Sequence, residues 1–335
     1  MNKITVVIPN YNGIHYIEGC LEALYAQEAD TPAFEILMVD NASADGGLEA
    51  AQHFVQKQLD AGGSSCVSTR FITLSRNTGF CHAVNVGIRN SSAPYVILLN
   101  NDTKVGKRFV KSLWEAIEAD PRIFSVSAKM LMWDRPELVD DAGDIYNVLG
   151  WAYARGKGKR AERYNRPARV FSACGGAAIY RRSILEQIGL FDERHFAYLE
   201  DLDLGYRARI HGYINRYEPQ AEVLHFGSAS TGSRYNAFKT KRAAANSVYV
   251  LYKNMPPLQL LWNLPFLTAG FCIKWLFFCK KRMGGLYLQG LAAGVGLCMS
   301  EKGRTHRVRF APQHMGNYLR IQLELYGNLC KQLLG

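Results

Sequence analysis

Short apolar runs that end in polar residues recur along the first hundred residues, and this pattern constrains the fold more than any other feature. Four runs have the length of buried strands: Ile4–Ile8, Glu35–Val39, Arg70–Leu74 and Tyr95–Leu99. Stretches with helical spacing of apolar residues separate them. The alternation predicts an α/β fold, Rossmann-like, with a mostly parallel sheet and helices on both faces.

The residues that follow these runs are polar, and they predict a ligand site. Because ligands bind beyond the carboxyl ends of parallel strands, we expect these residues to lie together around a substrate. Asp40 and Asn41 offer hydrogen-bond acceptors and donors to a nucleobase. The loop with Asn77 and Gly79 offers exposed backbone. The glycine patterns of dinucleotide-binding loops and P-loops do not occur in the sequence.

A divalent cation is expected at Asp102, in the sequence Asn100-Asn101-Asp102 after the fourth run. Mg²⁺ or Mn²⁺ keeps several waters and needs only one or two protein carboxylates beside substrate phosphates. His225, after the last predicted strand, is a second candidate ligand. The alternatives stay open, because Asn and Asp are common in turns and a lone histidine often serves only as a hydrogen-bonding group.

A general base is expected at Glu200-Asp201, which opens a predicted helix that continues through Arg207. The helix N-terminus favours an ionised carboxylate, and a base must be ionised before turnover. The alternative is that both acids only cap the helix. Asp203 and Arg207 lie four residues apart and are predicted to pair with each other.

Eight motifs between residues 3 and 254 together resemble glycosyltransferase family 2, most closely its rhamnosyltransferase-like branch for bacterial surface polysaccharides. They are VVIPNYNG (Val6–Gly13), VDNAS (Val39–Ser43), RNTGF (Arg76–Phe80), LLNNDT (Leu98–Thr103), GGAAIYRR (Gly175–Arg182), GLFDE (Gly189–Glu193), YLEDLDL (Tyr198–Leu204) and HFGSAS (His225–Ser230). The resemblance implies a GT-A fold, a nucleoside-diphosphate (NDP) sugar donor, a lipid-linked or oligosaccharide acceptor, and transfer with inversion.

The resemblance also implies roles for single residues. It places nucleotide contacts on Pro9, Tyr11, Asp40 and Asn77, the metal motif on Asn100, Asn101 and Asp102, the base on Glu200 and Asp201, and a histidine near the metal on His225. Asp201 is our choice for the base. Asn100 replaces the first aspartate of the family's metal motif. A single carboxylate remains, so we expect weak metal binding without the donor.

Two rival functions are weighed on the same residues. A sugar nucleotidyltransferase normally opens with a loop rich in glycine and arginine, and VVIPNYNG lacks the arginine and enough glycine. A degenerate, non-catalytic scaffold of the same fold is the second rival. The complete Glu200-Asp201 pair argues against a scaffold, whereas the single carboxylate of the metal motif argues slightly for one.

The last hundred residues are basic and apolar. From residue 239 onward the chain carries 14 Lys and Arg against two acids, which predicts an anionic partner. The apolar run Leu258–Cys279 favours a membrane surface with anionic lipids over nucleic acid. Asn263, Pro265, Gly270 and Lys274 interrupt it, and Lys274 would cost about 3 kcal/mol at a bilayer centre. We expect shallow or re-entrant insertion; the alternative is helices packed on the catalytic domain.

These patterns divide the chain into a catalytic domain, residues 1–254, and a membrane-associating helical segment, residues 255–335. Eight scattered cysteines without a C-x-x-C pair, and a first strand that begins near Met1, place the catalytic part on the cytoplasmic face of the membrane. The basic stretch Arg155–Arg169 is expected to be a mobile surface loop, or else a lid or a contact to acceptor phosphate.

Overall fold

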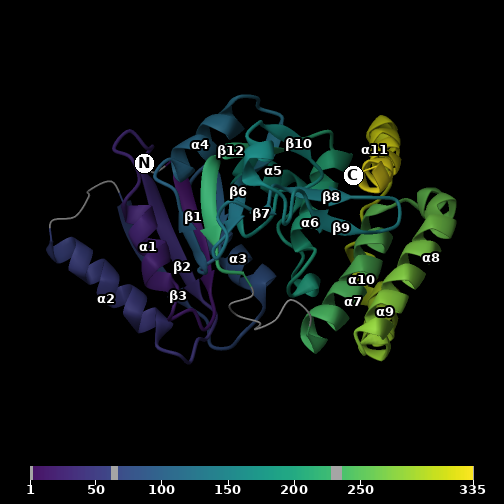
Figure 1. The fold of residues 1–335 in the computed structure, drawn as a ribbon, viewed down its shortest axis with the longest axis horizontal. Helices are drawn as coiled ribbons and strands as arrows, with labels where there is room; N and C mark the ends of the chain where they lie inside the picture. Colours follow the sequence, from purple (N-terminus) through teal and green to yellow (C-terminus); the bar gives the residue numbers. More distant parts are fainter. Residues whose placement is uncertain (1–2, 62–66, 228–235, 335) are drawn as a thin grey trace.

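In the computed structural model, which describes residues 3–61, 67–227 and 236–334, a 10-stranded sheet forms the centre of the molecule (Figure 1). Eight strands follow one another across it: β10 (Ala168–Val170), β12 (Ile214–His225), β6 (Ile123–Met132), β11 (Ala177–Arg181), β4 (Tyr95–Leu99), β1 (Ile4–Asn10), β2 (Phe34–Asp40) and β3 (Val67–Thr73). Two short strands complete it: β5 (Thr103–Val105) pairs with β12, and β7 (Val139–Asp141) pairs with β6. A separate ribbon joins β8 (Asp144–Tyr146) and β9 (Ala152–Ala154).

The first half of the sheet is parallel. Strands β4, β1, β2 and β3 run in the same direction, with Ile4 of β1 opposite both Phe34 and Tyr95. These are the four strands predicted from the apolar runs, although β3 begins at Val67 rather than at Arg70. Their carboxyl ends therefore meet at one edge, as the sequence predicted.

The second half is mixed, because β11 lies antiparallel between β4 and β6. Strand β6, which the sequence analysis did not predict, pairs in parallel with β12. Strand β12 is continuous from Ile214 to His225, and its pairing with β6 has an irregularity between Glu218 and Glu222. The basic stretch 155–169, expected to be a surface loop, is exposed or half-buried throughout, contains a short 3-10 helix (η1, Ala161–Tyr164) and leads into β10.

Helices cover both faces of the sheet. Packed on one face are α1 (Ile17–Tyr25), α2 (Gly47–Asp60) and α4 (Phe109–Glu118); on the other are α3 (Phe80–Arg89), α5 (Arg182–Ile188) and α6 (Glu200–Ile210). Alternate residues of β1 enter the two cores, Val6 on the α1 side and Val7 on the α3 side. This alternation follows from the strand period of two, and it explains why the buried strands are apolar throughout.

The C-terminal helices lie at one end of the molecule, beside α6 (Figure 1). They are α7 (Ala237–Asn254), α8 (Pro257–Lys280), α9 (Gly284–Met299), α10 (Glu301–Thr305) and α11 (Met315–Leu334), with a 3-10 turn, η3 (Pro312–His314), before α11. Helix α9 packs closely on α7, because a Cβ at Gly290 would lie 2.5 Å from the carbonyl oxygen of Lys241. Tyr318 and Leu325 of α11 share a core with Tyr206 of α6, so the segment packs on the α/β unit.

Of the described helices, α8 is long and apolar enough to cross a membrane by length and composition. Of its four interrupting residues, Pro265 is exposed and the other three face the protein. Asn263 is fully buried and exchanges two hydrogen bonds with Gln322 of α11, at 2.9 and 2.7 Å. A Cβ at Gly270 would lie 2.2 Å from the carbonyl oxygen of Leu149, and the Lys274 ammonium lies 5.7 Å from the centre of the Trp151 ring.

The outward side of α8 and α9 is apolar. We define the α8–α9 surface by its exposed large apolar residues: Leu258, Leu261, Trp262, Leu264, Ile273 and Leu276 of α8, with Leu288, Val295 and Met299 of α9. Because the inward residues Asn263, Leu267 and Gly270 repeat every three or four positions, they occupy one stripe of the helix. The polar interruptions in the sequence therefore do not interrupt this surface.

Candidate active site

Hydrogen bonds join the polar ends of the strands into one network. Asn10 donates to Asp40 at 2.8 Å and accepts from Asn101 at 2.6 Å, so the ends of β1, β2 and β4 are linked. A Cβ at Gly13 would lie 2.0 Å from the Asn101 amide nitrogen, which explains a glycine there. Asn41 donates to Asn77 at 3.1 Å and adds the β3–α3 loop to the network.

The residues expected to contact a nucleotide lie along this network. Asp40 is buried and accepts hydrogen bonds from the backbone and hydroxyl of Ser43. Pro9 lies in β1 opposite Val39, and Tyr11, which follows β1, is 37% exposed. Gly79 has a φ of +89°, and a Cβ there would meet the Phe196 ring at 2.5 Å, so other residues would clash.

The two expected metal ligands lie together. His225 Nε2 is 3.5 Å from Asp102 Oδ1, and His225 Nδ1 is 2.7 Å from Asp140 Oδ2. Asp140 also pairs with Lys157 of the basic stretch. Burial lowers the pKa of His225, but its hydrogen bonds with Asp102 and Asp140 outweigh this effect and raise the pKa to about 9.

This pair fits a divalent cation. A carboxylate oxygen is the ligand that Mg²⁺ and Mn²⁺ prefer, and imidazole can supply a second ligand. Asp140 holds Nδ1 and leaves Nε2 directed at Asp102, which is how carboxylates orient metal-binding histidines. A cation would have to displace the proton from Nε2, so metal binding would release a proton.

A second group of possible ligands, Asp192, His195 and Asp203, holds an ammonium group instead. Lys253 Nζ lies 2.7 Å from Asp192 Oδ2 and 2.8 Å from Asp203 Oδ2. Arg207 also donates to Asp203, at 3.0 Å, which confirms the predicted Asp203–Arg207 pair. With the charge of both carboxylates already compensated, we assign this group to the structure of the protein and not to a metal.

The expected base pair opens helix α6. Asp201 accepts hydrogen bonds from the backbone amides of Gly175, at 3.2 Å, and Leu202, at 2.8 Å. Burial raises the pKa of Asp201, and these amides oppose the rise. Among the described residues Glu200 Oε2 has no hydrogen-bond partner. Burial, with the nearby charge of Asp201, raises the pKa of Glu200 to about 8. The expectation that the helix N-terminus keeps this glutamate ionised is therefore wrong, because desolvation outweighs the helix dipole.

The backbone directly before Glu200 and Asp201 is strained, and hydrogen bonds from α7 hold it. Phe196, Tyr198 and Leu199, directly before Glu200, have φ values of +59°, +72° and +65°. The Asn246 amide of α7 donates to the carbonyl oxygens of His195, Ala197 and Tyr198, at 3.0, 2.9 and 2.7 Å. Backbone of this kind persists only where surrounding contacts determine it, and it concentrates at functional sites.

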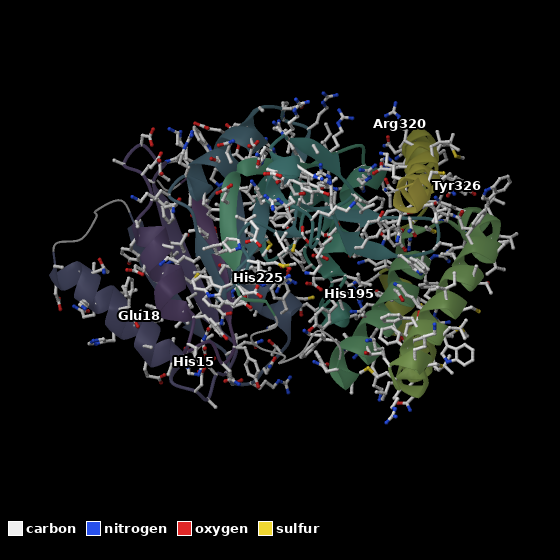
Figure 2. The ribbon with its side chains drawn as sticks, in the orientation of Figure 1. His15, Glu18, His195, His225, Arg320 and Tyr326 are labelled. Carbon is white, nitrogen blue, oxygen red and sulfur yellow. The ribbon has the colours of Figure 1, made fainter. Side chains whose placement is uncertain are left out.

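A short loop before β11 joins the base pair to the metal motif. The amide of Gly175 donates to Asp201, and the carbonyl oxygen of Gly176 accepts from the amide of Asn100 at 2.8 Å. In Figure 2 the labelled His225 lies near the middle of the molecule, and His195 lies between it and the C-terminal helices. The site therefore extends from the strand ends toward α6.

Sequence reasoning missed four residues of this arrangement. Asn10 comes two residues after the first apolar run, so the rule that strand ends are polar could have found it. Asp140 lies 85 residues from His225, and Asn246 and Lys253 lie in a helix distant in sequence, so no local pattern indicates them. Ser228–Ser230, the end of the HFGSAS motif, lie outside the described residues.

Comparison with known proteins identifies the family. The family model described as "Glycosyl transferase family 2" matches residues 5–189. The chain belongs to glycosyl transferase family 2. An N-acetylglucosaminyl-diphospho-decaprenol L-rhamnosyltransferase of Mycobacterium tuberculosis is 30% identical over 255 residues, which cover 68% of this chain and 78% of the relative. A teichoic acid poly(glycerol phosphate) polymerase of Staphylococcus epidermidis is 25% identical over 76% of this chain but only 32% of its own length.

Solved structures share the fold of this glycosyltransferase. GalNAc-T7, solved with UDP, GalNAc and Mn²⁺, has a TM-score of 0.59 and 16% identity over 76% of this chain and 48% of its own. The mannosyltransferase PcManGT of Pyrobaculum calidifontis, solved with GDP-Man and Mn²⁺, has a TM-score of 0.54 and 18% identity over 99% of this chain and 87% of its own. The family, the rhamnosyltransferase-like branch, the glycosyltransferase activity and the GT-A fold predicted from the sequence are confirmed.

The raised pKa of Glu200 predicts how stability depends on pH. Between the usual value of 4.5 and about 8, the folded protein binds this proton more tightly than the unfolded chain does. The free energy of unfolding should therefore fall as pH rises through this window. Glu200→Gln removes the proton equilibrium, whereas Glu49→Gln, at an exposed position of α2, should behave as the wild type. Urea unfolding between about pH 5 and pH 8 measures this; parallel pH profiles for wild type and Glu200→Gln would contradict it.

Proposed function

We propose that this glycosyltransferase moves a sugar from an NDP-sugar, with inversion, to a lipid-linked or polysaccharide acceptor in the synthesis of a cell-surface glycan. The observation that carries the proposal is one continuous site: the Gly175–Gly176 loop binds both Asp201 and Asn100, and Asn100 lies two residues before Asp102 of the Asp102–His225 pair. The names of the relatives support this acceptor class and suggest rhamnose, or another hexose, as the sugar.

The strand-end network would hold the nucleotide. In our proposal Asp40, Asn41 and Asn77 contact the nucleobase and ribose, while Pro9, Tyr11, Gly79 and Asn101 line the same edge. Asn41 and Asn77 already fix one another through a 3.1 Å hydrogen bond, so their amides need little reordering when the donor arrives. Preorganised polar groups of this kind give orientation and specificity to a small-molecule site.

Asp102 and His225 would hold Mg²⁺ or Mn²⁺ together with the donor diphosphate. When bound, the cation neutralises charge that develops on the leaving group. The solved neighbours GalNAc-T7, with UDP, GalNAc and Mn²⁺, and PcManGT, with GDP-Man and Mn²⁺, support a cation in an enzyme of this fold. Asp140 would keep the His225 ring oriented.

Asp201 would be the general base. The amides of Gly175 and Leu202 stabilise its negative charge, whereas Glu200 Oε2 has no donor among the described residues. When the pair shares one proton, Glu200, whose pKa is raised to about 8, would hold it, and the carboxylate of Asp201 would be available as an acceptor. The Asp201 carboxylate then accepts the proton of the acceptor hydroxyl as that oxygen attacks the anomeric carbon and the NDP leaves.

Replacement of Asp201 tests this assignment. Asp201→Asn should lower turnover by about 10²–10⁴, the usual contribution of a general base, and leave donor affinity near that of the wild type. Single-turnover kinetics with calorimetric donor titration measures both quantities. Asp45→Asn, near the amino end of α2, serves as a control. Full turnover in Asp201→Asn together with loss of turnover in Glu200→Gln would show that Glu200 is the base.

We further propose that the α8–α9 surface docks the enzyme on the cytoplasmic leaflet, where a lipid-linked acceptor is within reach. The surface is apolar, and the exposed Lys280 and Arg282 lie at the turn between the two helices, where they can attract anionic headgroups. Polar side chains of α8 face the protein, and its outward face is apolar. A helix of this kind can bury its apolar face at the membrane surface without crossing the bilayer. We therefore favour docking over spanning.

Vesicle flotation tests the docking. The triple variant Leu261→Ser, Trp262→Ser, Leu276→Ser should bind vesicles at least about tenfold more weakly. Each large apolar side chain that is buried contributes about 1.5–3 kcal/mol to the free energy of binding. Leu59→Ser, at a residue of α2 that is 62% exposed, is the matched control and should bind as the wild type. High salt should release only part of the protein, since screening weakens only the basic contribution. A C-terminus protected from protease inside sealed vesicles would contradict docking.

A further inference from the structure

Three aromatic rings lie beside the Asp102–His225 pair; two of them, Trp133 and Phe226, are stacked, and the ring of Tyr16 is tilted by 54° against Phe226. The ring centres of Trp133 and Phe226 are 3.7 Å apart with planes inclined by 22°, and those of Phe226 and Tyr16 are 4.7 Å apart. Tyr16 and Phe226 are half-buried, whereas Trp133 is 41% exposed. Phe226 covers one face of the indole, which leaves the ring edges and the other face to account for the exposed area of Trp133.

The backbone ties this aromatic stack to the metal motif. The amide of Trp133 donates to the carbonyl oxygen of His225, and the amide of Phe226 donates to the carbonyl oxygen of Asp102, both at 3.0 Å. The backbone of Trp133 and Phe226 is therefore fixed next to the pair that would hold the donor diphosphate.

The sheet order places the stack on the sugar side of the site. Trp133 follows β6 and Phe226 follows β12, and both strands lie across β4 from β2. The nucleoside is assigned to the end of β2, at Asp40, and the diphosphate to Asp102 after β4. A donor laid along this edge directs its sugar, and the acceptor that attacks it, toward β6 and β12.

The exposure of Trp133 distinguishes it from aromatic residues that only pack in the core. A ring needed only for the core would be buried, as Phe124 and Tyr180 are in the same half of the sheet. The polar groups that follow Trp133 are also exposed: the side chains of Asp134 and Arg135 are 76% and 58% accessible. Aromatic area beside a few polar groups is typical of small-molecule sites.

We propose that the free face of Trp133 binds the apolar face of a substrate pyranose ring, with Asp134 and Arg135 within reach of its hydroxyl groups. One side of a pyranose carries several C–H groups, which pack on the electron-rich face of an aromatic ring, while its edge carries the hydroxyls. The ring can belong to the donor sugar or to the first sugar of the acceptor. This inference rests on the proposed function, because it assigns the sugar subsite of that reaction.

Kinetics on three variants tests the proposal and identifies the source of the sugar. The substrates are dTDP-L-rhamnose and a water-soluble, short-chain prenyl-diphosphate N-acetylglucosamine. Trp133→Ala should raise one KM by about threefold to tenfold, Trp133→Phe should restore most of the loss, and Phe310→Ala is the control. Phe310 is 42% exposed and lies in the C-terminal segment, against Tyr318.

The two KM values distinguish the two sources. A higher KM for dTDP-L-rhamnose in donor hydrolysis without acceptor assigns the subsite to the donor sugar. A higher KM for the acceptor alone assigns it to the acceptor sugar. Equal KM values in wild type and Trp133→Ala, with an active wild type, overturn the subsite and leave the proposed function standing.

A binding measurement covers the case in which the wild type does not turn over these substrates. Saturation-transfer NMR with methyl rhamnoside and methyl N-acetylglucosaminide should show contact in the wild type and in Trp133→Phe, and loss of contact in Trp133→Ala. An inactive wild type that shows this pattern keeps the sugar subsite and contradicts only the transfer of rhamnose from dTDP-L-rhamnose to this acceptor. Equal signals in wild type and Trp133→Ala, or none in either, overturn the subsite.

Discussion

Two buried polar residues of helix α7 hold the segment on which the site depends. Lys253 joins Asp192 and Asp203, and Asn246 binds three carbonyl oxygens in the left-handed backbone before Glu200. Loss of Lys253 would leave two buried carboxylates short of a cation, and breaking a buried pair costs about 3–5 kcal/mol. That is a large part of a domain's stability. The position of Glu200 and Asp201 is thus set by contacts from α7, outside their own helix.

The fold and part of the site follow from the sequence because they rest on local patterns. Apolar runs gave β1, β2 and β4, and the polar residues after them gave the cluster around Asp40 and Asp102. Strand β6 escaped prediction because its sequence carries Ser125, Ser127 and Lys129. In the structure these polar groups bind Asn215, the Cys174 amide and Glu222, which are distant in sequence. Asp140 was not predicted for the same reason: its hydrogen-bond partner, His225, is distant in sequence.

Helix α8 of the C-terminal segment has two different sides: one packs on the α/β unit, and the other is apolar and exposed. Asn263 and Lys274 made the apolar run look unsuited to a membrane, but they lie against Gln322 and Trp151. The packing on the α/β unit and the apolar outward face coexist, so the two interpretations of this segment are not exclusive. Helix α7 lies between the two regions, because α9 packs closely on it and its Asn246 binds the backbone before Glu200.

The central claim is a single displacement in which an acceptor hydroxyl, deprotonated by Asp201, attacks the anomeric carbon from the side opposite the NDP. The anomeric configuration of the product tests this most directly. With the nucleotide sugar that supports turnover, the one-bond carbon–proton coupling at the anomeric centre should show a product inverted relative to the donor. A product with the donor's configuration would contradict the account, because retention requires a different mechanism in the same site.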